Sequence, residues 1–152
     1  MSPVYLKLEL THLEYLTQLL RVYEIEFEMT DFKLPVDTYL VRLLYNPNIL
    51  FYVAIDNNLV VGGLTAHILP SVYSEAGEVY IYDLAIKSEF QRKGIARQLL
   101  IELKQYCAES GYKEVFVQAD IEDQHALDFY RATGGKEEHV FHYSYSLEAY
   151  RK

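Results

Sequence analysis

The segment Glu78-Val-Tyr-Ile-Tyr-Asp-Leu-Ala-Ile86, with Gln91-Arg-Lys-Gly-Ile-Ala-Arg97 after a short polar loop, decides the fold of this chain. The first part is nearly all apolar, which is typical of a strand in the middle of a sheet. Residues 94–110 then repeat apolar side chains at helical spacing, and Gly111 supplies a C-terminal stop. The apolar positions of this helix are Ile95, Leu99, Leu103 and Tyr106. We therefore expect a strand, a turn and an amphipathic helix in succession.

The flanking sequence predicts further strands and helices around this unit. The expected elements are a strand over 4–10, a helix opened by a capping box at Thr11–Glu14, a helix with Pro35 in its first turn, strands over 49–55 and 59–69, a strand over 115–118, a helix over 123–133 and a last strand over 139–147. The turn at 56–58 makes a hairpin of two of these strands. Because this order mixes hairpins with crossovers, it predicts an α/β fold with a mixed sheet and helices on both faces.

Length and composition limit the classes of protein that fit. The chain has 152 residues, 51% of them hydrophobic, and this suits one globular domain over 1–152. Its net charge of −8 lacks the basic field of a nucleic-acid or anionic-membrane binder. No signal peptide and no apolar run of membrane-spanning length is visible. Cys107 is the one cysteine, which excludes an intramolecular disulfide and suggests the cytoplasm.

The turn before the long helix carries an unusual charge pattern. A helix N-terminus exposes unpaired N–H groups and a partial positive charge, so it favours negative side chains. Here it is flanked instead by Arg92, Lys93 and Arg97, while Gly94 allows close approach of a ligand to the backbone. A polyanion such as a pyrophosphate would explain the pattern, and so would an ordinary solvated loop.

Two motifs resemble those of a known family. Arg92-Lys-Gly-Ile-Ala-Arg97, preceded by Asp83-Leu-Ala-Ile86 on a strand, is similar to the acetyl-CoA signature of the GNAT superfamily of N-acetyltransferases. Asp128-Phe-Tyr130-Arg-Ala-Thr-Gly134 resembles the second motif of that family, in which a tyrosine precedes a helix-ending glycine by four residues. The resemblance spans residues 78–135 and implies a mostly antiparallel GNAT sheet with acetyl-CoA as co-substrate and no metal.

A narrower resemblance extends to the aminoglycoside 3-N-acetyltransferases of the gentamicin-resistance type. It rests on Tyr80–Ala85, Val117–Asp120, Glu122–Gln124 and Glu137-Glu138. It implies that Asp83 is the catalytic base, that Tyr130 lies beside the coenzyme sulfur and that a bulge in the strand supplies an oxyanion donor. The coenzyme contacts that it implies are Leu84, Ala85, Ile86, Gln91, Arg92, Lys93, Gly94, Ile95, Ala96, Arg97 and Asp123.

The chemistry of the residues agrees with this assignment. Asp83 is a lone carboxylate in an apolar strand, and partial burial would raise its pKa toward the range useful for a base. A buried structural aspartate is the alternative. The Tyr130 phenol suits a proton donor or hydrogen-bond donor to sulfur, or a core aromatic. Acidic residues in loops suit either a cationic acceptor or a solvated surface; they are Asp120, Glu122, Glu137 and Glu138.

Other residues carry less chemistry. Cys107 lies on the apolar face of the long helix, which favours packing over nucleophilic chemistry. His139 and His142 are expected on opposite faces of a strand, which makes them poor joint metal ligands. Asp123 stands where many members of the superfamily have an asparagine, and Ser144 and Ser146 stand where the aminoglycoside group tends to have aspartates.

We therefore expect an acetyl-CoA-dependent N-acetyltransferase that acts in a ternary complex on an amine of an aminoglycoside-like cation. A polyamine or protein amine is the alternative acceptor, and a non-catalytic acyl-CoA-binding module is the alternative class. By analogy with the superfamily, the segment 139–147 is also a candidate interface of a homodimer.

Overall fold

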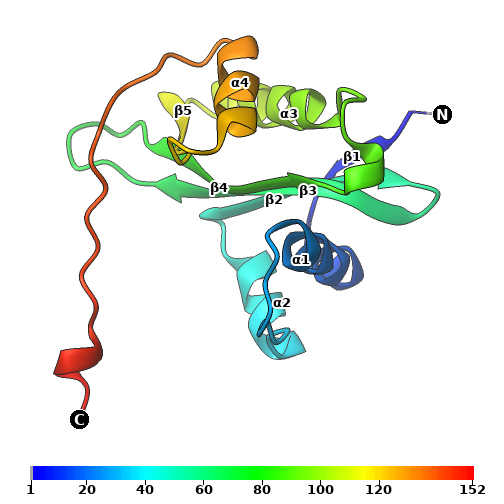
Figure 1. Cartoon of the computed structure of the whole chain (residues 1–152), viewed down its shortest axis with the longest axis horizontal. Helices are drawn as coiled ribbons and strands as arrows, with labels where there is room; N and C mark the ends of the chain where they lie inside the picture. Colours follow the sequence, from blue (N-terminus) through cyan, green and yellow to red (C-terminus); the bar gives the residue numbers. More distant parts are fainter. Residues whose placement is uncertain (1) are drawn as a thin grey trace. The chain divides into compact units, whose positions relative to one another are not determined.

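The computed structural model describes residues 2–152 (Figure 1). The chain forms two compact units, the first ending at Gln118 and the second running from Ala119 to Lys152. Each unit is built from its own local structure. The expectation of a single domain over 1–152 stays a prediction.

The first unit contains a five-stranded sheet in the order β1-β2-β3-β4-β5. Its strands are β1 (Val4–Lys7), β2 (Ile49–Asp56), β3 (Leu59–Leu69), β4 (Glu78–Ile86) and β5 (Glu114–Val117). Neighbouring strands are antiparallel except for β4 and β5, which are parallel. The predicted mixed, mostly antiparallel sheet is thereby confirmed.

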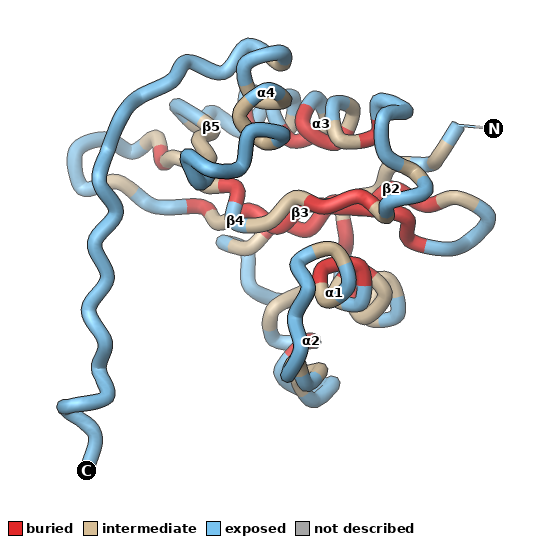
Figure 2. The backbone as a smooth tube through the Cα atoms, in the orientation of Figure 1, coloured by how far each residue is buried: buried red, intermediate tan, exposed pale blue. Residues whose placement is uncertain are grey.

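Helices cover both faces of this sheet, as the sequence predicts (Figure 1). They are α1 (Leu13–Glu26) and α2 (Asp37–Tyr45) on one face and α3 (Ile95–Glu109) on the other. Figure 2 shows the buried backbone concentrated in β2, β3, α1 and α3. Fully buried apolar side chains fill the space between the layers; they include Leu16, Leu19, Val53, Leu64, Leu99 and Leu103. At roughly 1.5–3 kcal/mol for each such side chain, burial of these faces is the main stabilising term of the first unit.

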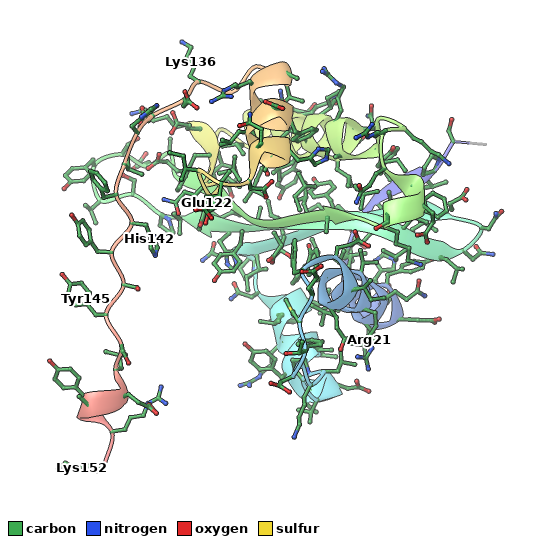
Figure 3. All side chains as sticks on the ribbon, viewed as in Figure 1. Arg21, Glu122, Lys136, His142, Tyr145 and Lys152 are labelled. Carbon is green, nitrogen blue, oxygen red and sulfur yellow. The ribbon has the colours of Figure 1, made fainter. Side chains whose placement is uncertain are left out.

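The second unit is smaller and contains α4 (Gln124–Ala132) and a short 3₁₀ turn, η2 (Glu148–Tyr150). Residues 135–147 connect them without regular structure. Figure 3 shows the side chains of His142 and Tyr145 projecting from this extended segment.

Three details differ from the expectations. The N-cap of α1 is His12 rather than Thr11, and no side-chain cap forms. The reason is a turn over residues 9–12, in which the His12 N–H donates to the Glu9 carbonyl and His12 Nδ1 accepts from the Glu9 N–H. Pro35 lies before α2, whose N-cap is Val36.

The third difference is the predicted last strand, which is wrong: residues 139–147 form no strand in the described structure. Their alternating pattern satisfies the side-chain requirement of a strand. A strand also needs a neighbour for its backbone N–H and C=O groups, and no described strand pairs with this segment.

Candidate active site

The end of β4 has one edge open. On one side β4 pairs with β3 as far as Ile86. On the other side β5 pairs only with Glu78–Ile81, because β5 ends at Val117 opposite Ile81. No described strand therefore pairs with this second edge beside Leu84–Ile86. Backbone groups on an open strand edge can hydrogen-bond an extended ligand, as an added strand would.

A bulge in β4 lies just before this open edge. Thr65 pairs with Asp83 while the next residue of β3, Ala66, pairs with Ile81, so Tyr82 has no partner in the register. Bulges bend a strand and change the direction of its side chains, and they are common beside active sites. The bulge predicted from the family resemblance is present in this chain.

Asp83 follows the bulge and is partly buried. Burial raises the pKa of its carboxyl above the ordinary value, while a hydrogen bond from Thr65 and the nearby His67 oppose the rise in pKa. The Thr65 Oγ1 also lies 2.9 Å from the hydroxyl of Tyr23 on α1. A carboxyl with a raised pKa, held by a neighbour, has the properties of a general base.

Two glycines of β3 allow the strands to approach closely beside this site. A Cβ on Gly62 would lie 2.9 Å from the Ala85 carbonyl oxygen and would collide with the Ile86 side chain. A Cβ on Gly63 would lie 2.6 Å from the Leu19 side chain on α1. The absence of a side chain at these two positions lets β3 pack closely against the triplet Leu84–Ile86 and against α1.

The segment 88–97, which we call the basic turn, runs from the end of β4 into the first turn of α3. It begins with the 3₁₀ turn η1 (Ser88–Phe90), and its backbone is left-handed at Arg92 (φ 62°) and at Gly94 (φ 82°). Left-handed residues in turns help successive N–H groups converge on an anion. Arg92 is not a glycine, so its conformation is strained, which is common at ligand sites.

The N-terminus of α3 is open to a ligand at this turn. The N-cap is Gly94, with no side-chain cap and no acidic residue in the first turn. The Gln98 N–H donates to the Gly94 carbonyl at 3.0 Å and closes the first turn of the helix. Among residues 2–152, neither Arg92 nor Lys93 forms an ion pair, although the Lys93 ammonium lies 5.3 Å from the Phe90 ring centroid. Two cations without a counter-ion at a helix N-terminus suit a polyanion.

Glu26, at the end of α1, anchors the basic turn. Its carboxylate accepts hydrogen bonds from the Ser88 hydroxyl at 3.0 Å and from the Ser88 N–H at 3.3 Å. It also accepts a hydrogen bond from Gln91 Nε2 at 3.2 Å, and the same nitrogen donates to the Ile86 carbonyl at 3.0 Å. Gln91 therefore joins β4 to the turn. Glu26 could not be predicted from the sequence, because no local pattern reveals a contact between residues 26 and 88.

The second unit holds the acidic residues, in a stretch over 120–138 that we call the acidic segment. Asp123 caps α4, since its carboxylate accepts from the Ala126 N–H at 3.1 Å. Asp120 accepts from the Glu122 N–H at 2.9 Å and so closes a local turn. Glu137 accepts from Arg131 at 2.7 Å, and this hydrogen bond is the first cause of its lowered pKa. Local structure thus accounts for three of these carboxylates.

Tyr130 lies on α4 and is partly buried. Burial, and secondly the charge of Asp123, raise the pKa of its phenol to about 12. Its ring packs edge-on against Phe129, with 5.2 Å between the centroids. A phenol with this pKa stays protonated at neutral pH and acts as a hydrogen-bond donor.

The predicted site residues thus fall into two groups. Asp83, the triplet and the basic turn are contiguous in the first unit, while Tyr130 and the acidic segment belong to the second. Besides Glu26, the sequence analysis missed the roles of Tyr23 and Thr65. A polar residue in an otherwise apolar strand was the available signal for Thr65. No cluster of three or more potential metal ligands occurs within residues 2–152, and no helix there is long and apolar enough to span a membrane.

Comparisons with known proteins identify the family of this chain. The model of the acetyltransferase (GNAT) family matches residues 14–134. An aminoglycoside acetyltransferase from an uncultured soil metagenomic sample, crystallised with trehalose, is 42% identical, with a TM-score of 0.94 over 96% of this chain and 97% of that one. Another aminoglycoside acetyltransferase from such a sample is 33% identical, with a TM-score of 0.90 over 96% of this chain and 99% of that one.

More distant structures share the fold alone. One is an aminoglycoside N-acetyltransferase of the AAC(6')-Iy type in complex with CoA, which is 18% identical, with a TM-score of 0.73 over 94% of this chain and 99% of that one. A search of curated protein sequences found no match. The family match and the structures above 30% identity show that this chain belongs to the GNAT acetyltransferase family.

Proposed function

We propose that this protein transfers the acetyl group of acetyl-CoA to an amine of an aminoglycoside-like cation, by direct attack in a ternary complex. The observation that carries the proposal is the basic turn, with its uncapped helix N-terminus, directly after the open edge of β4 and Asp83. The relatives described above at more than 30% identity are aminoglycoside acetyltransferases, and one of them was crystallised with sisomicin.

The residues of the first unit fit the coenzyme. The left-handed basic turn offers N–H groups, and its cations Arg92 and Lys93 form no ion pair within residues 2–152, which suits the pyrophosphate. The open edge of β4 offers backbone groups to the pantetheine arm. The proposed coenzyme contacts are Leu84, Ala85, Ile86, Gln91, Arg92, Lys93, Gly94, Ile95, Ala96 and Arg97. Gln91 acts through its side-chain bonds to Ile86 and Glu26, which hold the turn in place.

Bound acetyl-CoA supplies an acetyl group on a thioester, whose carbonyl carbon is the electrophile. Asp83 takes the proton that the acceptor amine loses as its nitrogen bonds to that carbon. Backbone N–H groups beside the bulge donate to the oxygen on which negative charge develops. Tyr130 donates a hydrogen bond to the sulfur as the carbon–sulfur bond breaks. The pKa of the Tyr130 phenol is about 12, well above the value of about 8.5 for a thiol. The phenol therefore donates a hydrogen bond to the thiolate rather than transferring its proton completely.

The acceptor is proposed to bind through acidic side chains. Glu122 and Glu138 make no side-chain hydrogen bond or ion pair within residues 2–152, so they are available to ammonium groups. Asp120 and Glu137 complete the proposed acceptor contacts, and each also forms a hydrogen bond in its local structure. Asp123, which caps α4, is proposed to contact the coenzyme. A polyamine or protein amine is the alternative acceptor that this charge would also suit.

The proposal extends to assembly and location. We propose a homodimer through residues 139–147, whose aromatic side chains Phe141, Tyr143 and Tyr145 are exposed and whose backbone has no strand partner in the described structure. Light scattering of the full chain and of a variant with these three aromatics replaced by serine tests it, and a monomeric wild type contradicts it. The cytoplasm is the proposed compartment, because the chain has a single cysteine, which is buried.

The experiment is turnover of the purified full chain with acetyl-CoA and a panel of amines. The panel contains sisomicin, spermidine and a lysine peptide, and the readouts are release of the coenzyme thiol and acetylated product by mass spectrometry. We expect product with sisomicin. Product with spermidine or the peptide alone would contradict the acceptor, and coenzyme binding without any product would contradict catalysis.

A further inference from the structure

A buried pair of hydroxyls lies behind the proposed base. The hydroxyl of Tyr23 on α1 and the Oγ1 of Thr65 on β3 are 2.9 Å apart. Tyr23 is 4% exposed and Thr65 is 7% exposed. Tyrosines aside, Thr65 is the one polar or charged side chain that is buried within residues 2–152. A valine would fill the same volume without the cost of burying a hydroxyl, so the Thr65 hydroxyl calls for an explanation.

The strand register supplies the explanation. Thr65 lies directly opposite Asp83, at the bulge in β4, and hydrogen bonding by Thr65 is the first of the two effects that lower the pKa of the Asp83 carboxyl. A carboxylate only accepts hydrogen bonds, so the single Thr65 hydroxyl hydrogen points to Asp83. The Thr65 oxygen is then left to accept from Tyr23. With Thr65 as the donor to Asp83, Tyr23 is the donor to Thr65.

We propose that Thr65, supported by Tyr23, is a positioning residue that holds the Asp83 carboxylate for its part in proton transfer. The inference rests on the proposed role of Asp83 as base. Both residues act through Asp83 rather than on the substrate. The series Tyr23, Thr65 and Asp83 also links α1 to β4 inside the first unit. The helix that covers the sheet thereby helps to fix the orientation of the base.

The hydrogen bonds also set the charge state of Asp83. Burial raises the pKa of Asp83, and the Thr65 hydrogen bond and His67 oppose this rise. Within residues 2–152, these two groups on β3 act on the pKa of Asp83, and Asp83 acts in turn on the pKa of Tyr23 on α1. Burial, and secondly the charge of Asp83, raise the pKa of Tyr23 well above its ordinary value, so the phenol keeps its proton and remains a donor. Hydroxyls in series polarise one another and strengthen the last bond to the carboxylate.

The test measures the titration of Asp83 without relying on turnover. Thr65→Val removes the hydroxyl at nearly constant volume, Thr65→Ser restores it, and Tyr23→Phe removes the second donor. Tyr52→Phe is the matched control, because Tyr52 is 5% exposed, packs its ring 6.4 Å from that of Tyr106 on α3, and is not among the groups that shift the pKa of Asp83. The probe is the NMR titration of the side-chain carboxyl carbon of Asp83 in the free protein, at pH values where each variant is folded.

We expect the Asp83 midpoint to move upward by about one pH unit in Thr65→Val, in keeping with the loss of one hydrogen bond to a charged group. Tyr23→Phe should move it in the same direction by less, while Thr65→Ser and Tyr52→Phe should stay near the wild type. The acid limb of kcat/KM should follow the NMR midpoint. An unmoved midpoint in Thr65→Val overturns the inference.

The positioning role of Thr65 and the role of Asp83 as base are contradicted by different results. If Thr65→Val leaves the midpoint unmoved but Asp83→Asn still abolishes the acid limb, the positioning role is overturned and Asp83 stands as the base. If the NMR midpoint moves while the acid limb of kcat/KM does not, and Asp83→Asn keeps that limb, Asp83 is not the base and the positioning role is overturned with it.

Discussion

The basic turn and the acidic segment bear similar densities of charge, yet their charges are used differently. In the acidic segment, Asp123 caps a helix, Asp120 closes a turn and Glu137 pairs with Arg131. In the basic turn, Arg92 and Lys93 have no counter-ion within residues 2–152, and Arg92 holds a left-handed backbone. Local structure explains most of the acidic charges and leaves the charges of Arg92 and Lys93 unexplained.

This difference separates two kinds of support. A charged residue that already serves a cap or a turn needs no ligand to account for it. Cations placed at a helix N-terminus, where the dipole disfavours them, do need one. The coenzyme half of the proposed function therefore has the firmer structural basis, and the acceptor half depends mainly on Glu122 and Glu138.

The largest effect that tests this comparison is expected at the basic turn. Arg92→Ala with Lys93→Ala should raise the Kd for acetyl-CoA by about 100-fold, because charge-assisted contacts to phosphate contribute about 1.5–3 kcal/mol each before screening. Binding of pantetheine, which lacks the phosphates, should barely change. Isothermal titration calorimetry measures both. Lys33→Ala with Lys104→Ala removes the same charge from exposed positions and should leave both affinities unchanged. Equal losses for the two ligands would refute a pyrophosphate site.

A smaller effect is expected in the acidic segment. Glu122→Gln with Glu138→Gln should raise KM for the cationic acceptor by about 3–10-fold and leave kcat unchanged, because exposed charge pairs contribute about 0.2–1 kcal/mol each. Steady-state kinetics at low and high salt measures the effect, which should shrink with salt. Glu14→Gln with Glu109→Gln removes equal charge from α1 and α3 and serves as the control. A KM that the control pair raises as much would show a general effect of net charge instead of a binding site.

The smallest effect concerns Asp123, for which the cap and the coenzyme contact predict different results. Asp123→Ala should lower the free energy of unfolding by about 1 kcal/mol through loss of the cap. Asp123→Asn keeps a capping side chain and should remain near wild type. Hydrogen exchange at the Ala126 amide, which the cap protects, follows the local loss. Should Asp123→Asn instead weaken acetyl-CoA binding at unchanged stability, the carboxylate is a coenzyme contact and capping is secondary.

Much of this arrangement could be predicted from local sequence. The strand, turn and helix over 78–110 follow from apolar spacing, and Gly94 and Gly111 mark the ends of α3 with left-handed backbones. The placement of Asp83 before the triplet follows from the motif. What local patterns miss is contact between distant residues. Glu26 reaches Ser88 and Gln91 because α1 ends beside β4, and Thr65 faces Asp83 only because of the register at the bulge.

The wrong last strand has the same cause. Residues 139–147 alternate as a strand does, from Phe141 onward, and alternation reports only which side chains would share a face. Whether a segment becomes a strand depends on a partner edge, which is a property of the assembled structure. A pattern of one segment cannot report on its neighbour.

The central claim is that Asp83 accepts the proton of the acceptor amine. Burial raises the pKa of Asp83, so the wild-type kcat/KM should fall as pH decreases through a midpoint above that of an ordinary aspartate. The decisive measurement is kcat/KM against pH for the wild type and Asp83→Asn, with the folding of both checked by thermal unfolding. We expect Asp83→Asn to lose about 10²–10⁴-fold in rate and to lose this acid limb, with acetyl-CoA affinity unchanged. A folded Asp83→Asn variant that keeps the wild-type rate and the same acid limb would contradict the account.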